Sequence, residues 1–306
     1  WLTTAQSSAT EVSFEVATTG SVGKRIRKDD ADLVLFYGSE QRGSLDTCGC
    51  PKRPRGGLPR VAGYVERSTR RSGAPSVLLN AGAWLDDTIG LGGGLRRDVI
   101  MANEWTVRAF QVGQWDALNV GFRDLPYLSS EGFPEAAVSS TISGVQNYRI
   151  LDAGGIRVAV TGVSPEGKTF LAPEGYTYFS VQTALDAVVP EMRAASDVVV
   201  VLAYDLGRGG RALASREDID VVIEAGAFLS AFEPEVVTST VWVRSNDQTK
   251  RLGELRLWLG DEGVARALDR KIDLDDRIPD QRELARLRDA QEEDVDRVRR
   301  ELFGSW

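Results

Sequence analysis

The chain has 306 residues, enough for one large domain or two ordinary ones, and its 42% hydrophobic and 27% charged residues are typical of a soluble globular protein. A formal net charge of -8 argues against a nucleic-acid partner, and no apolar run approaches the ~20 residues of a membrane-spanning helix. The sequence contains no histidine, which excludes mechanisms that need an imidazole base or metal ligand.

Residues 1–31 are polar and end in a basic cluster at 24–28. We expect a mobile arm, which is either a solvated tail or a segment that binds a partner. The first residue is Trp1 rather than Met, which favours a processed product that has lost a targeting segment. The expected organisation is an arm at 1–31, a main domain at 32–270 and a helical extension at 271–306.

Apolar runs alternate with stretches of helical spacing along the first two thirds of the chain. Buried strands are predicted at 33–37, 76–80, 115–121, 156–163, 197–203 and 219–223. Helices are predicted between them at 58–71, 97–112, 181–195 and 211–216. This alternation predicts an α/β architecture.

The last part of the chain has two different patterns. Residues 236–259 alternate with period 2 around a turn at 246–248, which predicts an antiparallel hairpin and a second sheet. Residues 279–303 predict one long charged helix, which packs on the main domain or pairs with a coiled-coil partner. Its narrow apolar stripe consists of Leu284, Leu287, Val295, Val298 and Leu302.

The first predicted strand is followed by the pattern Gly43-x-Leu45-x-x-Cys48-Gly-Cys50. This order resembles the first motif of the calcineurin-like metallophosphoesterases, in a Cys-Gly-Cys subgroup of their 5′-nucleotidase-like branch. In that family the strand ends in Asp-x-His, whereas here residues 40–42 read Glu-Gln-Arg. The resemblance implies a four-layer αββα sandwich, and it covers roughly residues 32 to 260.

Four further motifs of that family have counterparts here in the same order. The second motif, Asp-Ala-Gly-Asp, is replaced by Asn-Ala-Gly-Ala at 80–83, and the third, Gly-Asn-His-[Glu/Asp], by Gly-Phe-Arg-Asp at 121–124. The fourth motif, Ser-His, is replaced by Ala-Tyr at 203–204. The fifth, Gly-Gly-His-Ser-His, is replaced by Glu-Ala-Gly-Ala-Phe at 224–228. By this resemblance the degenerate former metal-site positions are Glu40, Arg42, Ala83, Phe122, Arg123, Tyr204, Gly226 and Phe228.

A two-metal phosphoesterase needs oxygen and imidazole ligands that hold two ions about 4 Å apart. Arginines and apolar residues at those positions imply that no catalytic metal or other cofactor is bound and that the inherited chemistry is lost. Five carboxylates lie near predicted strand ends: Glu40, Asp46, Asp124, Asp205 and Glu224. They could still bind Ca²⁺ or Mg²⁺, or they could be solvated or paired with Arg42 and Arg123. Arg42 and Arg123 could instead hold an anion.

Cys48 and Cys50 are the only cysteines. They could form a strained, redox-labile disulfide, remain free thiols in a structural loop, or hold a metal transiently. The resemblance favours the disulfide, because the subgroup with Cys-Gly-Cys tends to be exported.

These features predict a non-catalytic structural or accessory subunit of an extracytoplasmic (periplasmic), membrane-associated assembly, such as an electron-transfer complex. Its partners would be other protein subunits, and it would reach the membrane through them or through a lost N-terminal anchor. The alternatives are a redox enzyme that uses Cys48 and Cys50, a divergent hydrolase that uses the carboxylates, and an anion-binding protein.

Overall fold

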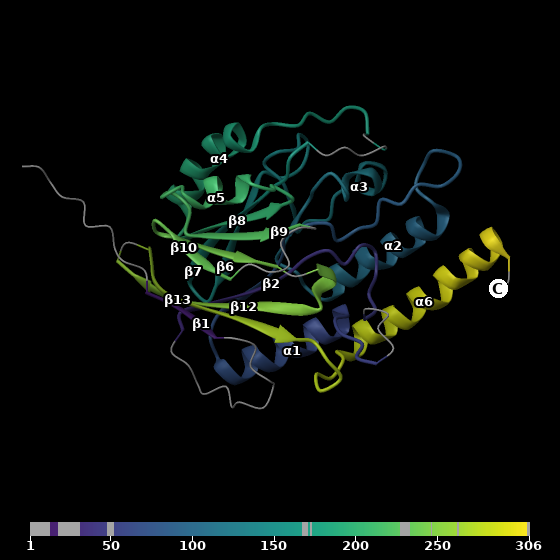
Figure 1. Ribbon diagram of the computed structural model, residues 1–306, viewed down its shortest axis with the longest axis horizontal. Helices are drawn as coiled ribbons and strands as arrows, with labels where there is room; N and C mark the ends of the chain where they lie inside the picture. The colour runs from purple at the N-terminus through teal and green to yellow at the C-terminus, as the bar shows by residue number, and fades with distance from the viewer. Residues whose placement is uncertain are drawn as a thin grey trace, which may run out of the picture.

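The computed structural model describes residues 13–17, 31–47, 52–166, 171, 173–226, 233–245, 247–261 and 263–304, with 13–17 and 247 given as backbone alone. Two β-sheets lie face to face in this part of the chain, and helices cover the outer face of each (Figure 1). The predicted α/β class and the four-layer αββα order are therefore confirmed.

The first sheet has seven strands and mixed direction. In sheet order they are β1 (Ser13–Ala17), β13 (Gly263–Asp273), β12 (Arg251–Gly260), β2 (Leu33–Gly38), β3 (Ser76–Asn80), β4 (Ala117–Asn119) and β5 (Ala137–Val138). Strands β2 to β5 are parallel, β12 is antiparallel to both β2 and β13, and β1 is parallel to β13. The carboxyl ends of β2, β3 and β4 therefore meet at one edge of this sheet.

The second sheet has six strands with a parallel centre. In sheet order they are β10 (Glu235–Val237), β11 (Thr240–Arg244), β9 (Val221–Ala225), β8 (Val198–Tyr204), β7 (Ile156–Val163) and β6 (Tyr148–Ala153). Only the two edge strands, β10 and β6, run antiparallel to their neighbours. Every residue of β8 is buried, as its run of valines predicts for a strand that is covered on both faces.

The helices lie in the two outer layers. Those that pack on the first sheet are α1 (Leu58–Ser72), α2 (Arg97–Val112), α3 (Leu125–Glu131) and α6 (Arg282–Phe303), and those that pack on the second are α4 (Val181–Ala195) and α5 (Gly209–Ala214). Helix α6 begins three residues later than predicted. The reason is that the side chain of Gln281 accepts a hydrogen bond from the Leu284 amide at 2.8 Å and so caps the helix.

The predicted hairpin at 236–259 is wrong, because its two halves belong to different sheets. Strand β11 pairs with β10 and β9, whereas β12 pairs with β13 and β2. The chain crosses between the sheets around the short 3₁₀ helix η1 (Asp247–Thr249), close to Ser245, whose hydroxyl accepts a hydrogen bond from Ser39 at 2.8 Å. Strands β12 and β13 therefore extend the first sheet, while β10 and β11 lie at one edge of the second.

Both ends of the described chain pack on the main body. Leu284, Val295 and Val298 of the α6 stripe are buried against the domain, beside α1 and α2, while Leu302 is exposed. The stripe thus packs on the parent domain rather than on a coiled-coil partner. Within the expected arm, residues 13–17 form the edge strand β1, and residues 1–12 and 18–30 lie outside the described part.

Candidate functional site

Loops from neighbouring strand ends are hydrogen-bonded together at one edge of the sandwich. After β2 and β3, the amide of Glu40 donates to the Gly82 carbonyl at 2.9 Å, and the amide of Arg42 donates to the Ala83 carbonyl at 3.2 Å. The end of β8 reaches the same place, since Tyr204 packs against the loops that follow β3 and β4. The fold therefore brings together the motif positions around Glu40, Ala83 and Tyr204, which are far apart in the sequence.

Tyr204 fills the space between these loops. A Cβ atom on Gly82 would come within 2.8 Å of the Tyr204 Cβ, and one on Gly121 within 3.2 Å of its ring. The ring also packs on Phe122, with centroids 5.7 Å apart. Burial, followed by the nearby carboxylates, raises the pKa of Tyr204 despite the opposing charge of Arg123, so its hydroxyl stays protonated.

The side chain of Arg123 is partly exposed and lies beside Tyr204. Its Nε donates to the Tyr204 hydroxyl at 3.1 Å, and its Nη1 donates to Asp87 at 2.8 Å in an ion pair. The same group lies over the Phe122 ring, 5.5 Å from its centroid. Arg42 forms a second ion pair with buried Glu40 at 3.4 Å. Both arginines of the degenerate motifs are thus neutralised by carboxylates of this chain.

The backbone at this edge is unusually rich in left-handed residues. Glu40, Arg42, Ala83 and Asp205 have φ values of 57°, 50°, 52° and 55°. A residue with a side chain costs roughly 1 kcal/mol or more in this region, so the loops hold strain that the surrounding structure must offset. Gly226 adopts a φ of 149° beside Asp205, which glycine alone adopts readily.

Asp124 ties the loops together from inside. Its fully buried carboxyl accepts hydrogen bonds from the amides of Gly121 at 3.0 Å and Leu85 at 2.9 Å. Burial raises the pKa of Asp124 to about 7, although these amide contacts work in the opposite direction. This carboxyl therefore joins the loop after β3 to the loop after β4 and faces backbone amides rather than a cavity.

Buried amides, which the sequence patterns did not single out, connect the layers. The Asn119 side chain donates to the carbonyls of Ala81 at 3.0 Å and of Val163 and Leu202 at 3.1 Å, and so links the first sheet to the second. Gln41 accepts from Asn80 at 2.7 Å and donates to Thr249 at 2.5 Å, beside a polar cavity of about 200 Å³. In the sequence, the only indication of such a contact is an amide side chain within an apolar strand.

Glu224 and Asp46 lie apart from this centre. Glu224 is fully buried at the end of β9, where it accepts a hydrogen bond from Trp242 at 3.0 Å and lies 3.9 Å from the Arg244 guanidinium. Burial raises its pKa to about 7, against the opposing effects of those two residues. Asp46 is exposed and accepts from the amide of Thr47 at 2.6 Å. Glu224 and Asp46 therefore contact partners different from those of Asp124.

The described side chains do not fit the two-metal centre that the resemblance would imply. Ala83, Phe122 and Gly226 have no donor atom in their side chains, and Arg123 places a positive charge among them. Within the described ranges, no group of three or more Asp, Glu or Cys side chains could hold an ion. Phe228, Cys48 and Cys50 lie outside those ranges, so the expected disulfide stays a prediction.

Several solved structures with similar folds carry the names of hydrolytic enzymes, whereas no family model and no curated protein matches the sequence. The sulfate thiohydrolase SoxB of Thermus thermophilus matches with a TM-score of 0.70 and 18% identity, over 86% of this chain and 60% of its own. A 5′-nucleotidase precursor, also from Thermus thermophilus, matches with a TM-score of 0.69 and 17% identity, over 86% of this chain and 59% of its own.

The calcineurin-like phosphoesterase YfkN of Bacillus subtilis matches at a TM-score of 0.65 and 17% identity, over 88% of this chain and 99% of its own. The chain spans about 60% of the length of the first two structures. At these identities the likeness shows the fold, which agrees with the expected calcineurin-like architecture. Among the described helices, none combines the length and apolar character needed to cross a membrane.

Proposed function

We propose that this chain is a non-catalytic relative of the phosphoesterases that serves as an accessory binding subunit of an extracytoplasmic, membrane-associated assembly, for which an electron-transfer complex is one candidate. The main support is the hydrogen bond between Arg123 and Tyr204, because the motif resemblance assigns both residues to former metal-site positions, and here they are a cation and a packed aromatic ring. A guanidinium repels a divalent ion strongly in such a partly buried place.

The competing functions have less support. A divergent hydrolase would need acidic groups that face a shared substrate, whereas Asp124 contacts backbone amides and Glu224 contacts Trp242 on another strand. An anion site would need guanidinium groups available to a ligand, whereas Arg42 and Arg123 each pair with a carboxylate. A surface role is compatible with every one of these contacts.

Metal analysis together with a hydrolysis assay tests the absence of catalysis. Purified protein is incubated with excess Mn²⁺ and dialysed, its metal content is measured, and its activity is followed with bis-p-nitrophenyl phosphate and AMP. YfkN of Bacillus subtilis, treated in the same way, provides the control. We expect no stoichiometric metal and no turnover above the protein-free rate. Two tightly bound ions per chain, or turnover that Arg123→Ala abolishes, would refute the proposal.

Co-purification from the native membrane tests the binding role. We expect the chain to be recovered in a complex of defined composition, at constant stoichiometry through two chromatography steps. Recovery as a monomer from mild membrane extracts would count against a subunit role, whatever the result of the metal analysis.

A further inference from the structure

A cavity of about 640 Å³ lies between α1, the end of α2 and the start of α6, with the first residues of β3 in its lining. It is separate from the candidate site, which lies beyond the carboxyl end of the same strand. Cavities of this size are typical of binding sites, which combine an apolar lining with a few polar groups. The apolar lining residues come from α1, β3 and α2: Ala62, Val65, Val77, Leu78 and Val112.

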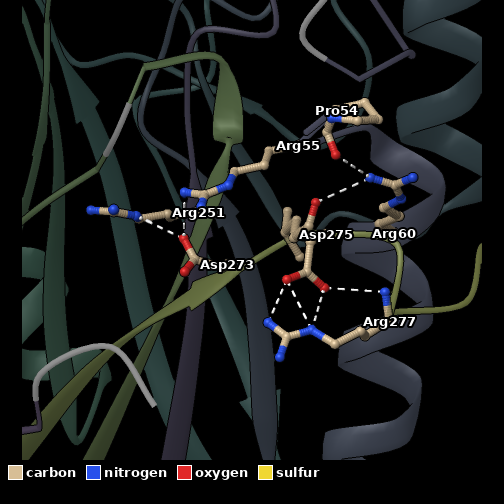
Figure 2. A network of polar contacts seen from close by, with 8 residues as sticks. Pro54, Arg55, Arg60, Arg251, Asp273, Asp275 and Arg277 are labelled. Atoms are coloured by element: carbon tan, nitrogen blue, oxygen red, sulfur yellow. Dashed lines mark hydrogen bonds and ion pairs between the residues drawn. The ribbon is translucent and has the colours of Figure 1, made fainter. Parts of the chain in front are cut away.

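The wall formed by the start of α6 is held against α1. The amide of Gln281, which lines the cavity, donates to the Pro59 carbonyl at 2.8 Å. On the same helix, Arg60 donates to the carbonyls of Pro54 at 2.9 Å and Leu274 at 3.2 Å (Figure 2). These contacts fasten the segment between β13 and α6 to α1, so this side of the cavity is formed without a partner.

Four charged side chains line the cavity, and three of them are acidic: Glu66, Asp116, Glu283 and the single cation Arg70. Within the described part of the chain, none of the four belongs to an ion pair. Even if Arg70 offsets Glu66, which lies one helical turn before it, two carboxylates remain without a cation. The arginines on neighbouring turns of α1 and α6 lie outside the lining: Arg67, Arg71, Arg282 and Arg286.

Asp116 is partly buried, whereas Glu66 and Glu283 are exposed. One oxygen of Asp116 accepts a hydrogen bond from the Leu78 amide at 2.7 Å, and the other accepts none from the described residues. Burial raises the pKa of Asp116, although the Leu78 amide and the charge of Arg149 act in the opposite direction. A cation that enters the cavity would favour the ionised form of this carboxyl and would itself be stabilised there.

We propose that this cavity binds a segment of a partner protein that carries both basic and apolar side chains. This inference rests on the proposed role as a binding subunit and specifies the chemistry of one contact surface. Lys and Arg side chains combine a charged end with an apolar stem. The stems and the neighbouring apolar side chains can therefore cover Val65 and Val112, while the charged ends reach Glu66 and Glu283.

A basic protein segment fits this cavity better than a small cation or a second copy of the chain. A single amine pairs with one carboxylate, whereas the three acidic residues come from three parts of the chain. A polyamine carries several charges but no apolar side chains to cover Val65 and Val112, which are only partly buried. A second copy brings a net charge of -8 of its own, and like charges disfavour such an association.

The test measures, by anisotropy, the binding of a fluorescein-labelled Lys-rich peptide with interspersed Leu and of the same peptide with Ser in place of Leu. The test variant combines Glu66→Gln and Glu283→Gln. The control combines Glu104→Gln and Glu293→Gln, which remove the same charge from exposed positions outside the lining. With the Leu-containing peptide we expect about tenfold weaker binding for the test variant and less than about twofold change for the control. The Ser-containing peptide should bind the natural chain at least about fivefold more weakly.

Equal losses in the two variants would show that net charge alone drives binding, and would overturn the assignment to this cavity. Equal binding of the two peptides would show that the apolar lining contributes nothing, and would overturn the protein segment in favour of a polyamine. A dimer of the natural chain that dissociates in the test variant, measured by sedimentation, would overturn it in favour of a second copy. Near-ultraviolet circular dichroism and thermal unfolding confirm that each variant is folded.

Failure of this inference is distinguishable from failure of the proposed function. A chain that co-purifies with other subunits but binds neither peptide keeps its binding role and loses only this contact surface. A chain that binds the Leu-containing peptide through the cavity, yet holds two metal ions tightly or hydrolyses a phosphodiester, keeps the surface and loses the non-catalytic role.

Discussion

The side-chain amide of Gln291, in the middle of α6, donates a hydrogen bond to the carbonyl of Gly43 at 2.9 Å. The oxygen of the same side chain accepts from the amide of Leu45 at 3.0 Å. Gly43 and Leu45 belong to the motif that follows β2, so a residue near the end of the chain holds the loop that organises its beginning. Helix α6 is therefore a structural part of the sandwich.

Replacing Gln291 with Leu should destabilise the fold by about 2–3 kcal/mol, because it leaves the buried Leu45 amide and Gly43 carbonyl without this partner. Urea unfolding measures the change. Glu292→Leu, at the exposed neighbouring position, is the matched control and should change the free energy of unfolding by less than about 0.5 kcal/mol. Similar stabilities for the two variants would contradict the structural role of Gln291.

The strands and helices that carry a strong apolar period could be predicted from the sequence. The runs around β2, β3 and β8 are continuous, because these strands are covered on both faces. Strand β13 gave no such signal, since Asp269, Arg270 and Lys271 interrupt it. Asp269 is nonetheless buried, where it accepts a hydrogen bond from Tyr37 at 2.7 Å and pairs with Lys271 at 2.9 Å. Pairing across sequence-distant strands makes such burial tolerable, and local patterns cannot reveal it.

The positions of the candidate site could be predicted from the sequence, but the contacts between its side chains could not. The motifs named the positions, and the hydrogen bond between Glu40 and Gly82 shows that two of the loops that carry them are adjacent. The partner of Arg123 was missed, because Asp87 belongs to no motif and approaches only in three dimensions. The hairpin was wrong for a related reason: a period-2 pattern identifies strands but does not say which sheet each one joins.

Gln248, beside the site, offers a test of backbone strain. It is exposed and has a φ of 53°, so Gln248→Gly should stabilise the protein by about 0.5–1 kcal/mol by removing the left-handed penalty. The control Gln111→Gly, in the last turn of α2, should destabilise by a similar amount, because glycine there only adds flexibility. Thermal unfolding of both variants checks the opposite signs, and destabilisation by Gln248→Gly would contradict the strain.

Glu224 should make stability fall as the pH rises. Its pKa of about 7 in the folded state lies above the ordinary value of 4.5, so the folded state keeps the proton longer. Between roughly pH 4.5 and 7 the unfolded state releases this proton first, and stability therefore declines with increasing pH by up to about 3 kcal/mol.

Glu224→Gln should remove this contribution to the decline, while the contribution of Asp124 remains, and should leave the variant more stable than the natural chain above about pH 8. Urea unfolding at a series of pH values measures the difference, with the exposed position Glu66→Gln as the control. Parallel pH profiles for Glu224→Gln and the natural chain would show that Glu224 is ionised in the folded state throughout.

Asn119 should tolerate a carboxylate less well than an apolar side chain. Its amide nitrogen donates to three buried carbonyls, one from the loop after β3 and two from β7 and β8 of the opposite sheet. Asn119→Asp keeps the shape but sets a carboxyl oxygen against those carbonyls, so we expect a loss of about 4 kcal/mol or more. Asn119→Leu removes the donor without adding charge and should cost about 2–3 kcal/mol. Urea unfolding at neutral pH should show the larger loss of stability for Asn119→Asp. At low pH the new carboxyl is protonated, and the difference in stability between the two variants should become smaller. If the two variants lose the same stability at neutral and at low pH, the amide of Asn119 only fills space between the sheets.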